Sequence, residues 1–203
     1  MIHPEWANIR RGIVHNEDTG ESWQFFMNPE EITTQIEVNW TKSAAIGASY
    51  ERLSYQNTAN ATFDLVLRHN RIWFADVSRA PIDQVNLSPQ GFASGRQLNP
   101  SEYDTIRDEF EKKRRFLMSL CYPRGRVNDV VRRSPPHCIL LWPGYLAVRV
   151  ILRSLQMADS QFDTNGQPVY FEASCQFEEY RTYRLTSADV FKVGFIRQTV
   201  GAK

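Results

Sequence analysis

The strongest constraint on the fold is a period-two alternation of side chains along residues 145–178. The apolar positions of the first segment are Leu146, Val148, Val150 and Leu152. After a polar turn, the apolar positions are Val169, Phe171, Ala173, Cys175 and Phe177. A period of two is typical of β-strands that bury one face. We therefore predict one long hairpin over about 145–178, large enough to organise a mainly β domain.

The turn of this hairpin has the sequence FDTNGQP, residues 162–168. Asn165-Gly166 tolerates the positive φ angles that close a tight turn. The same segment resembles the start of a calcium-binding loop, but it lacks the alternating acidic ligands and the terminal Glu of such loops. We therefore interpret it as a turn and expect no metal site here.

The first strand of the hairpin, Tyr145–Asp159, is longer than the usual strand of ~3–10 residues. Two explanations are open. Either a bulge or bend interrupts the strand, or it extends beyond the domain into an assembly. A domain with many strands must protect its edges, and pairing with a neighbouring chain is one way to do so. A barrel shared among several chains fits the second explanation.

The rest of the chain divides into segments with different patterns. Residues 1–21 are polar and rich in turn formers, and are expected to form an N-terminal arm or a first hairpin. The β domain is expected over 22–185, with an extended interaction loop at 78–100 that contains several Pro and Gly residues. Residues 186–203 are apolar enough to act as a docking tail. Further strands are expected at 22–27, 32–40, 50–55 and 61–68, with a loop at 56–60.

One helix is expected, at about 101–121. Ser101 is a suitable N-cap residue, with Asp104 three positions later. The apolar positions recur at helical spacing: Tyr103, Ile106, Phe110, Leu117 and Leu120. This helix is predicted to pack beside the β domain with one apolar stripe.

Composition and motifs argue against several functions. The 24 basic and 23 acidic side chains give a net charge of +1, which favours neither nucleic acids nor acidic membranes as partners. The four His residues lie far apart without metal-ligand spacing, and no catalytic or nucleotide-binding motif is present. We expect no catalytic residues, metal or cofactor. The three cysteines are expected to be free thiols.

Charge is unevenly distributed along the chain. Residues 107–133 contain nine basic and four acidic side chains, whereas residues 1–70 contain five basic and nine acidic ones. The centre of the basic segment is Lys112, Lys113, Arg114 and Arg115. Three interpretations are open: solvated faces, an acidic face of one subunit meeting a basic face of the next, or a nucleic-acid patch. The last ranks third because aromatic residues are not interleaved with the basic ones.

Taken in order, these motifs resemble a known family. The segments on which the resemblance rests are WQFFMNPEEI (23–32), Trp40, residues 50–55, the alternating residues 63–67, SPP (134–136), LLWPG (140–144) and FDTNGQPVYFEA (162–173). Together they resemble the tube-like domain of baseplate adaptor or tube-initiator proteins in contractile phage tails and related injection systems. The resemblance covers about residues 23–180. Many relatives carry a LysM-type module after this domain, and the residues after Tyr180 are too few for one.

The resemblance implies a tail-tube fold, an antiparallel β-sandwich or barrel with one flanking helix, whose subunits join as a hexameric ring. The hairpin would line the lumen, with interface candidates Tyr145, Arg149, Arg153, Phe162, Asp163, Gly166, Pro168 and Glu172. Lys112, Lys113, Arg114 and Arg115 would form a basic inter-subunit face. Phe25, Phe26, Asn28 and Pro29 would form the N-terminal strand and turn, and Trp40 a core or interface anchor.

The function implied is structural: a ring-forming adaptor or tube initiator that links a spike hub to the tail tube. Its expected location is the virion tail baseplate, assembled in the host cytoplasm. Expected partners are its own copies, the hub, the tube protein and baseplate wedge or sheath components, with no membrane and no specific nucleic acid. The alternatives are a tail tube subunit or tube terminator and, from another class, an enzyme or a small β-domain that binds nucleic acid.

Overall fold

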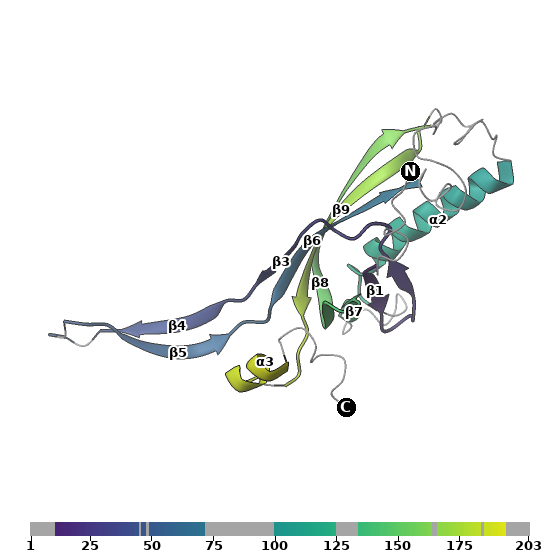
Figure 1. Ribbon diagram of the computed structural model, residues 1–203. Coiled ribbons are helices and arrows are strands. Elements are labelled where there is room, and N and C mark those ends of the chain that lie inside the picture. Colours follow the sequence, from purple (N-terminus) through teal and green to yellow (C-terminus); the bar gives the residue numbers. More distant parts are fainter. Residues whose placement is uncertain are drawn as a thin grey trace.

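The structure is a computed structural model of the 203-residue chain. It describes residues 11–44, 46–47, 49–71, 100–124, 134–163, 166–183 and 185–193. The expected mainly β fold with antiparallel strands, a flanking helix and a long hairpin is confirmed (Figure 1). The expected 78–100 loop lies outside the described residues except for Pro100, which opens the helix.

Nine strands and two helices make up the described fold. The strands are β1 (Ile13–Asn16), β2 (Ser22–Gln24), β3 (Ile32–Gln35), β4 (Val38–Ser43), β5 (Arg52–Thr58), β6 (Thr62–Asn70), β7 (Cys138–Trp142), β8 (Leu146–Phe162) and β9 (Pro168–Glu179). The helices are α2 (Pro100–Ser119) and α3 (Ser187–Val193). Seven strands form one sheet in the order β2-β1-β7-β8-β9-β6-β3, and β4 and β5 pair separately.

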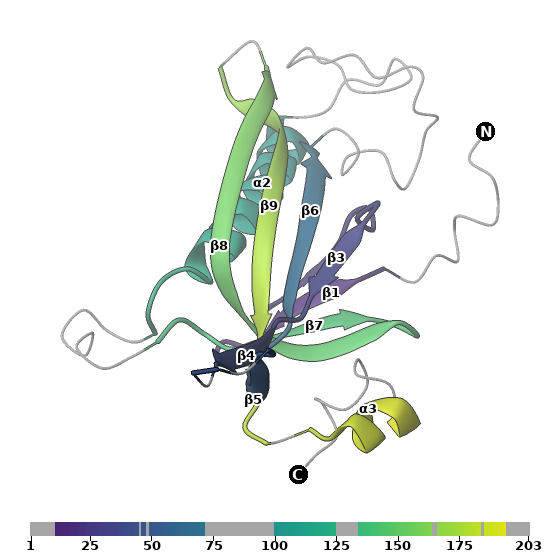
Figure 2. The same cartoon turned by 90° about the vertical axis from the view of Figure 1, so that its left-hand side faces the viewer.

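The seven-stranded sheet is folded into two layers, and β8 belongs to both. The first part of β8 pairs with β7, from Leu146↔Trp142 to Val150↔Cys138. From Val150 onward β8 pairs with β9, up to Phe162↔Pro168. The register shifts between Leu152 and Ser154, which marks a β-bulge at the point where the strand changes layers. Figure 2 shows β6, β8 and β9 side by side, with β1 and β7 crossing below them.

The core lies between these layers and α2. β6 and β9 bury every second residue, as the alternation predicted. Trp23 of β2 packs against Phe171 of β9 with ring centroids 6.4 Å apart, and Phe110 of α2 packs against the same ring at 5.2 Å. Phe116 and Leu117 complete the buried stripe of α2, and Leu120, directly after the helix, is also buried. Burial of these large apolar side chains is the dominant stabilising contribution to such a fold.

Several expected boundaries require correction. Helix α2 begins at Pro100, so Ser101 lies inside the helix and is not its N-cap; proline is favoured at a first helical position because its missing N–H needs no partner there. The expected strand 22–27 ends at Gln24, and the expected loop at 56–60 is wrong for residues 56–58, which continue β5. β1 is part of the main sheet, so the β domain starts before residue 22.

The described sheet is open. Its two ends are β2 and β3, which do not pair with each other, so the barrel alternative is not formed within one described chain. Of the two explanations for the length of the 145–159 strand, the bulge is confirmed, and extension into an assembly stays a prediction. A bulge interrupts β8, and beyond Val150 no described strand pairs with its other edge. All three cysteines are free thiols.

Candidate assembly surfaces

A hairpin arm projects from the body of the molecule. We define the arm as β4, β5 and the turn that joins them, residues 38–58 (Figure 1). Every residue of β4 and β5 is exposed. The body therefore covers neither face of this hairpin, and the arm is the largest element without a packing partner in the described chain.

The two faces of the arm differ in chemistry. The register places Trp40 opposite Tyr55 and Lys42 opposite Leu53. Residues directly opposite in an antiparallel pair share a face. One side, which we call the apolar arm face, therefore carries Val38, Trp40, Leu53 and Tyr55 with Lys42 and Thr58. The other side is polar throughout and carries Asn39, Thr41, Ser43, Arg52, Ser54 and Asn57.

In the single chain, the apolar arm face exposes aromatic side chains, as the interfaces of protein subunits do. The Trp40 and Tyr55 rings pack edge to face at 5.6 Å, yet Trp40 is 54% exposed and Tyr55 53% exposed. An isolated two-stranded hairpin is at best marginally stable in water. Exposed aromatic clusters of this kind mark protein–protein contacts. Trp40 is thus excluded as a core anchor, and its role as an interface anchor remains a prediction.

The tip of the β8–β9 hairpin is fixed to the body by a buried ion pair. The Arg71 Nη2 atom lies 2.6 Å from Asp163 Oδ2, and the two side chains are 1% and 2% exposed. Asp163 Oδ1 also accepts a hydrogen bond from the Gln167 N–H at 2.9 Å, and Gly166 has a φ angle of +73°. Asp163 and Gly166 therefore shape the turn, whereas neighbouring Phe162 is 62% exposed and available for contact.

The remaining hairpin candidates lie at four different places. Arg149 pairs with Glu17 at 2.5 Å and lies over the Tyr180 ring, which joins β8 to the turn after β1. Arg153 pairs with Glu178, and Glu172 pairs with Arg68, on the polar outer side of the layer β8-β9-β6-β3. Tyr145 is exposed in the turn between β7 and β8. Pro168 is half-buried and opposite Phe162.

The four predicted basic residues do not form one uniform face. Arg114 forms ion pairs with Glu111 at 3.1 Å and with Asp159 of β8 at 2.6 Å, so its charge is neutralised within the chain. Lys112, Lys113 and Arg115 have no salt bridge to any described residue and line a cavity beside β2. Partial burial lowers the pKa of Lys113; Glu109 opposes this effect and Lys112 adds to it.

The N-terminal candidates serve the packing of the fold. Phe25 is fully buried against Gly12, where an added Cβ would lie 2.5 Å from the ring, so only glycine fits. The Asn28 side chain accepts a hydrogen bond from the Gly12 N–H at 2.9 Å. Phe26 lies edge-on to His69, and Pro29 is half-buried. These residues follow the end of β2 at Gln24, so they lie outside the expected N-terminal strand, and their role in a turn stays a prediction.

The structure also contains features that the sequence analysis missed. His69 is buried among Trp23, Phe110 and Phe171, and this burial, helped by the charge of Lys113, lowers its pKa to about 4. The sequence could have indicated this burial. His69 follows Phe63, Leu65 and Leu67 at a spacing of two, so it lies on the buried face of β6. The Arg71–Asp163 pair joins residues 92 positions apart, and no local pattern indicates it.

No described helix is long and apolar enough to cross a membrane. Likewise, no group of three or more His, Cys, Asp or Glu side chains among the described residues is placed to hold a metal ion.

Comparison with known proteins identifies a family. The family model described as contractile injection system tube protein matches residues 12–188. No curated protein matches. Among solved structures, one similar chain comes from the tail of an empty GTA particle, computed with helical refinement in C6 symmetry. It shares 9% sequence identity at a TM-score of 0.36, over 88% of this chain and 96% of that chain.

Proposed function

Since the chain belongs to the family of contractile injection system tube proteins, we propose that it is a ring-forming structural component that links a spike hub to the tail tube. In this proposal it is an adaptor or tube initiator in the baseplate, its rings hold six subunits, and it acts without catalysis or a cofactor. The observation that carries self-assembly is the arm, whose apolar face no part of the described chain covers.

The free edge of β8 supports the same proposal. Beyond Val150 one side of this strand has no described partner strand, and β3 forms the opposite edge of the same four-stranded layer. Edges of this kind are templates for pairing with another chain. Edge pairing between neighbours would join the layers around a ring and turn their polar outer sides, with Arg153 and Glu172, toward the lumen.

The adaptor role rests on a further exposed element. Helix α3 follows the sheet and is capped by Thr186, whose hydroxyl accepts a hydrogen bond from the Asp189 N–H at 3.3 Å. Phe191 on this short helix is 91% exposed. A subunit between two different neighbours needs a contact beyond those that repeat along a tube. We propose that α3 supplies it, toward the hub or a wedge or sheath component.

A second candidate is the tail tube subunit itself, or a tube terminator. The observation in its favour is the extent of the family match, which takes in every described strand and both described helices in whole or in part. The two candidates differ in what nucleates assembly, because a tube subunit polymerises with itself whereas an adaptor forms rings on a hub.

The test of self-assembly is a pair of variants on one strand. Trp40→Lys places a charge on the apolar arm face, and Thr41→Lys places the same charge on the polar face one residue later. We expect Trp40→Lys to abolish rings or tubes in negative-stain images and Thr41→Lys to retain them. Because both side chains are exposed, neither variant should unfold the monomer. Equal assembly of the two variants would contradict the proposal.

The adaptor and the tube subunit are separated by imaging the purified chain alone and with its hub protein. Rings that form only with the hub support the adaptor, and long tubes from the chain alone support the tube subunit. Monomers under both conditions would overturn both.

A further inference from the structure

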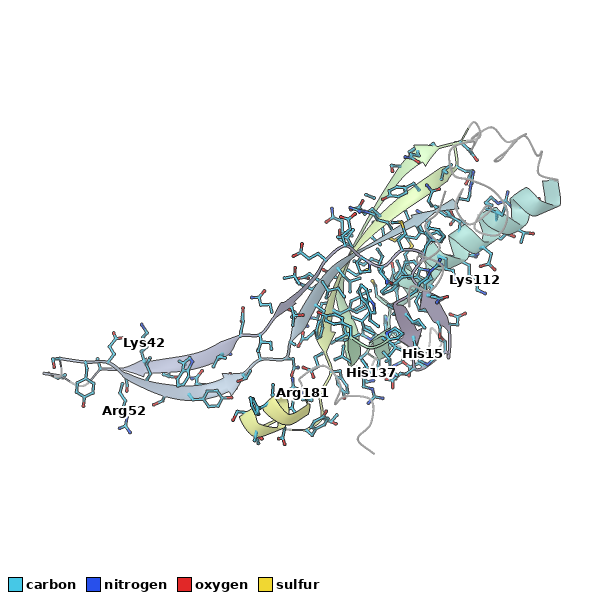
Figure 3. All side chains as sticks on the ribbon, in the orientation of Figure 1. His15, Lys42, Arg52, Lys112, His137 and Arg181 are labelled. Atoms are coloured by element: carbon cyan, nitrogen blue, oxygen red, sulfur yellow. The ribbon has the colours of Figure 1, made fainter. Side chains whose placement is uncertain are left out.

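A cavity lies between the edge strand β2 and helix α2. Its volume is about 450 Å³, and its lining residues are Glu21, Ser22, Trp23, Lys112, Lys113, Arg115, Phe116 and Ser119. Figure 3 shows Lys112 on α2 and His15 on β1, both on the side of the molecule opposite the arm. The cavity is separate from the arm and from the outer side of the four-stranded layer.

The lining of the cavity contains more basic than acidic side chains. Lys112, Lys113 and Arg115 come from one turn of α2 and face a single acidic residue in the lining, Glu21. None of the three has a salt bridge to a described residue, in contrast to Arg114 between them. The Trp23 Nε1 atom is also buried without a hydrogen-bond partner among the described residues. A buried indole N–H is usually hydrogen-bonded, and basic side chains without a salt bridge are available to an acidic ligand.

The strand beside the cavity has a free edge. The Phe25 N–H donates to the Gly12 carbonyl, and the Asn16 N–H donates to the Glu21 carbonyl. In an antiparallel ladder this alternation directs the backbone groups of Trp23 toward β1. The backbone N–H and C=O groups of Ser22 and Gln24 therefore point away from β1, and no described strand lies on that side of β2.

We propose that this cavity binds an extended, acidic segment of another polypeptide, which adds a strand to the free edge of β2. Backbone hydrogen bonds to Ser22 and Gln24 would give the affinity common to strand addition. Side chains of an added strand alternate between its two faces. Every second side chain would then face α2, so carboxylates spaced two residues apart would meet Lys112, Lys113 and Arg115.

This geometry predicts the sequence pattern of the ligand. A segment of the type Glu-x-Glu-x-Glu places its carboxylates on the helix side, whereas a block of the same acidic residues places some of them in solvent. Because the ammonium and guanidinium groups are partly exposed, binding should weaken with salt. The pattern separates strand addition from simple attraction between opposite charges.

The experiment uses the full chain and three fluorescent probes in anisotropy titrations. The first is the peptide Glu-Val-Glu-Val-Glu-Val, the second is Glu-Glu-Glu-Val-Val-Val, and the third is a single-stranded oligothymidine of ten nucleotides. We expect the alternating peptide to bind about tenfold more tightly than the block peptide. Equal binding of the two peptides, tighter binding of the oligonucleotide, or no binding of the alternating peptide at millimolar concentration would overturn the proposal.

Two test variants and one control variant locate the site. Lys112→Gln combined with Arg115→Gln should weaken the alternating peptide about tenfold, and the matched double variant Arg52→Gln, Arg107→Gln should not. Gln24→Pro removes an outward N–H of β2 without removing a bond to β1, and should weaken the peptide several-fold. A Gln24→Pro protein that folds, by circular dichroism, and binds with unchanged affinity would contradict strand addition.

Discussion

At the scale of single residues, the buried polar groups are the most consequential. His69 lies within 5.6 Å of the Phe110 ring centroid and within 5.5 Å of that of Phe171, in surroundings that stabilise the neutral imidazole. Burial, with a smaller contribution from the charge of Lys113, lowers its pKa from 6.5 to about 4. The folded chain therefore binds a proton at this site less readily than the unfolded chain does.

This difference predicts how stability depends on pH. Between pH 6.5 and 4 the unfolded state binds the proton and the folded state does not, so the free energy of unfolding falls as pH falls through this window. The loss attributable to His69 is about 3 kcal/mol, from about 1.4 kcal/mol per pKa unit. Urea unfolding at pH 7.5 and pH 4.5 measures it.

The variant His69→Leu should lose less stability over the same pH range, because leucine at position 69 cannot bind a proton. A matched control is His15→Gln, which removes a ring that forms an exposed hydrogen bond with Ser22. If His69→Leu and the unchanged chain show the same dependence on pH, His69 is not its source.

The Arg71–Asp163 pair supports a second prediction at this scale. Removing one partner of a buried pair leaves an unpaired charge and costs about 3–5 kcal/mol. We expect Asp163→Ala to lower the free energy of unfolding by this amount, and the double variant Arg71→Met, Asp163→Ala to lower it by less than the sum of the two single variants. A double-mutant cycle based on urea unfolding gives the coupling. Additive losses in the two single variants would show that the pair is not coupled.

At the scale of elements, the sequence predicts which face of a strand or helix is buried better than it predicts where the element begins, ends or bulges. Alternation identified the buried sides of β6 and β9. Helical spacing identified Phe110 and Leu117 on the buried stripe of α2, and the buried Leu120 directly after the helix. The bulge next to Leu152 was foreseen as one explanation for a long strand, but its position was not. A bulge depends on how two partner strands are offset, and this offset is set by contacts distant in the sequence.

Adjacent positions of α2 test its packing on the sheet. Leu117 is fully buried and Met118 is 41% exposed. Leu117→Ala should lower the free energy of unfolding by about 2–5 kcal/mol, since it removes apolar contacts and leaves a cavity. Met118→Ala should change it by less than about 0.5 kcal/mol. Thermal or urea unfolding of the two variants is sufficient, and similar losses would mean that α2 packs on a different face.

At the scale of the whole molecule, the arm shows the limit of single-chain reasoning. Apolar residues at a spacing of two, such as Leu53 and Tyr55, look the same in the sequence whether they meet their own core or another chain. The same limit applies to the basic residues 112–115. Only the fold reveals that Arg114 is paired with Asp159 and that its neighbours line a cavity.

A deletion of the arm tests whether the body folds without it. Ile36 and Ala61 continue the register of β3 and β6, in which Gln35 lies opposite Thr62. Replacing residues 37–60 by Asn-Gly would join them through a two-residue hairpin turn. We expect this variant to keep its melting temperature within a few degrees and to lose assembly, as measured by calorimetry and by light scattering. A collapse of the melting temperature would mean that the arm stabilises the body.

The sharing of β8 between the two layers has a mechanical consequence. A single uninterrupted backbone runs from the pairing with β7 into the pairing with β9, with the bulge at the crossing. Tension applied along this strand would be resisted by both ladders in shear, where many hydrogen bonds must break together instead of one after another. The covalent backbone of β8 therefore transmits force from one layer to the other. Pulling on the hairpin tip in a single-molecule experiment would load the whole sheet before either layer could peel away.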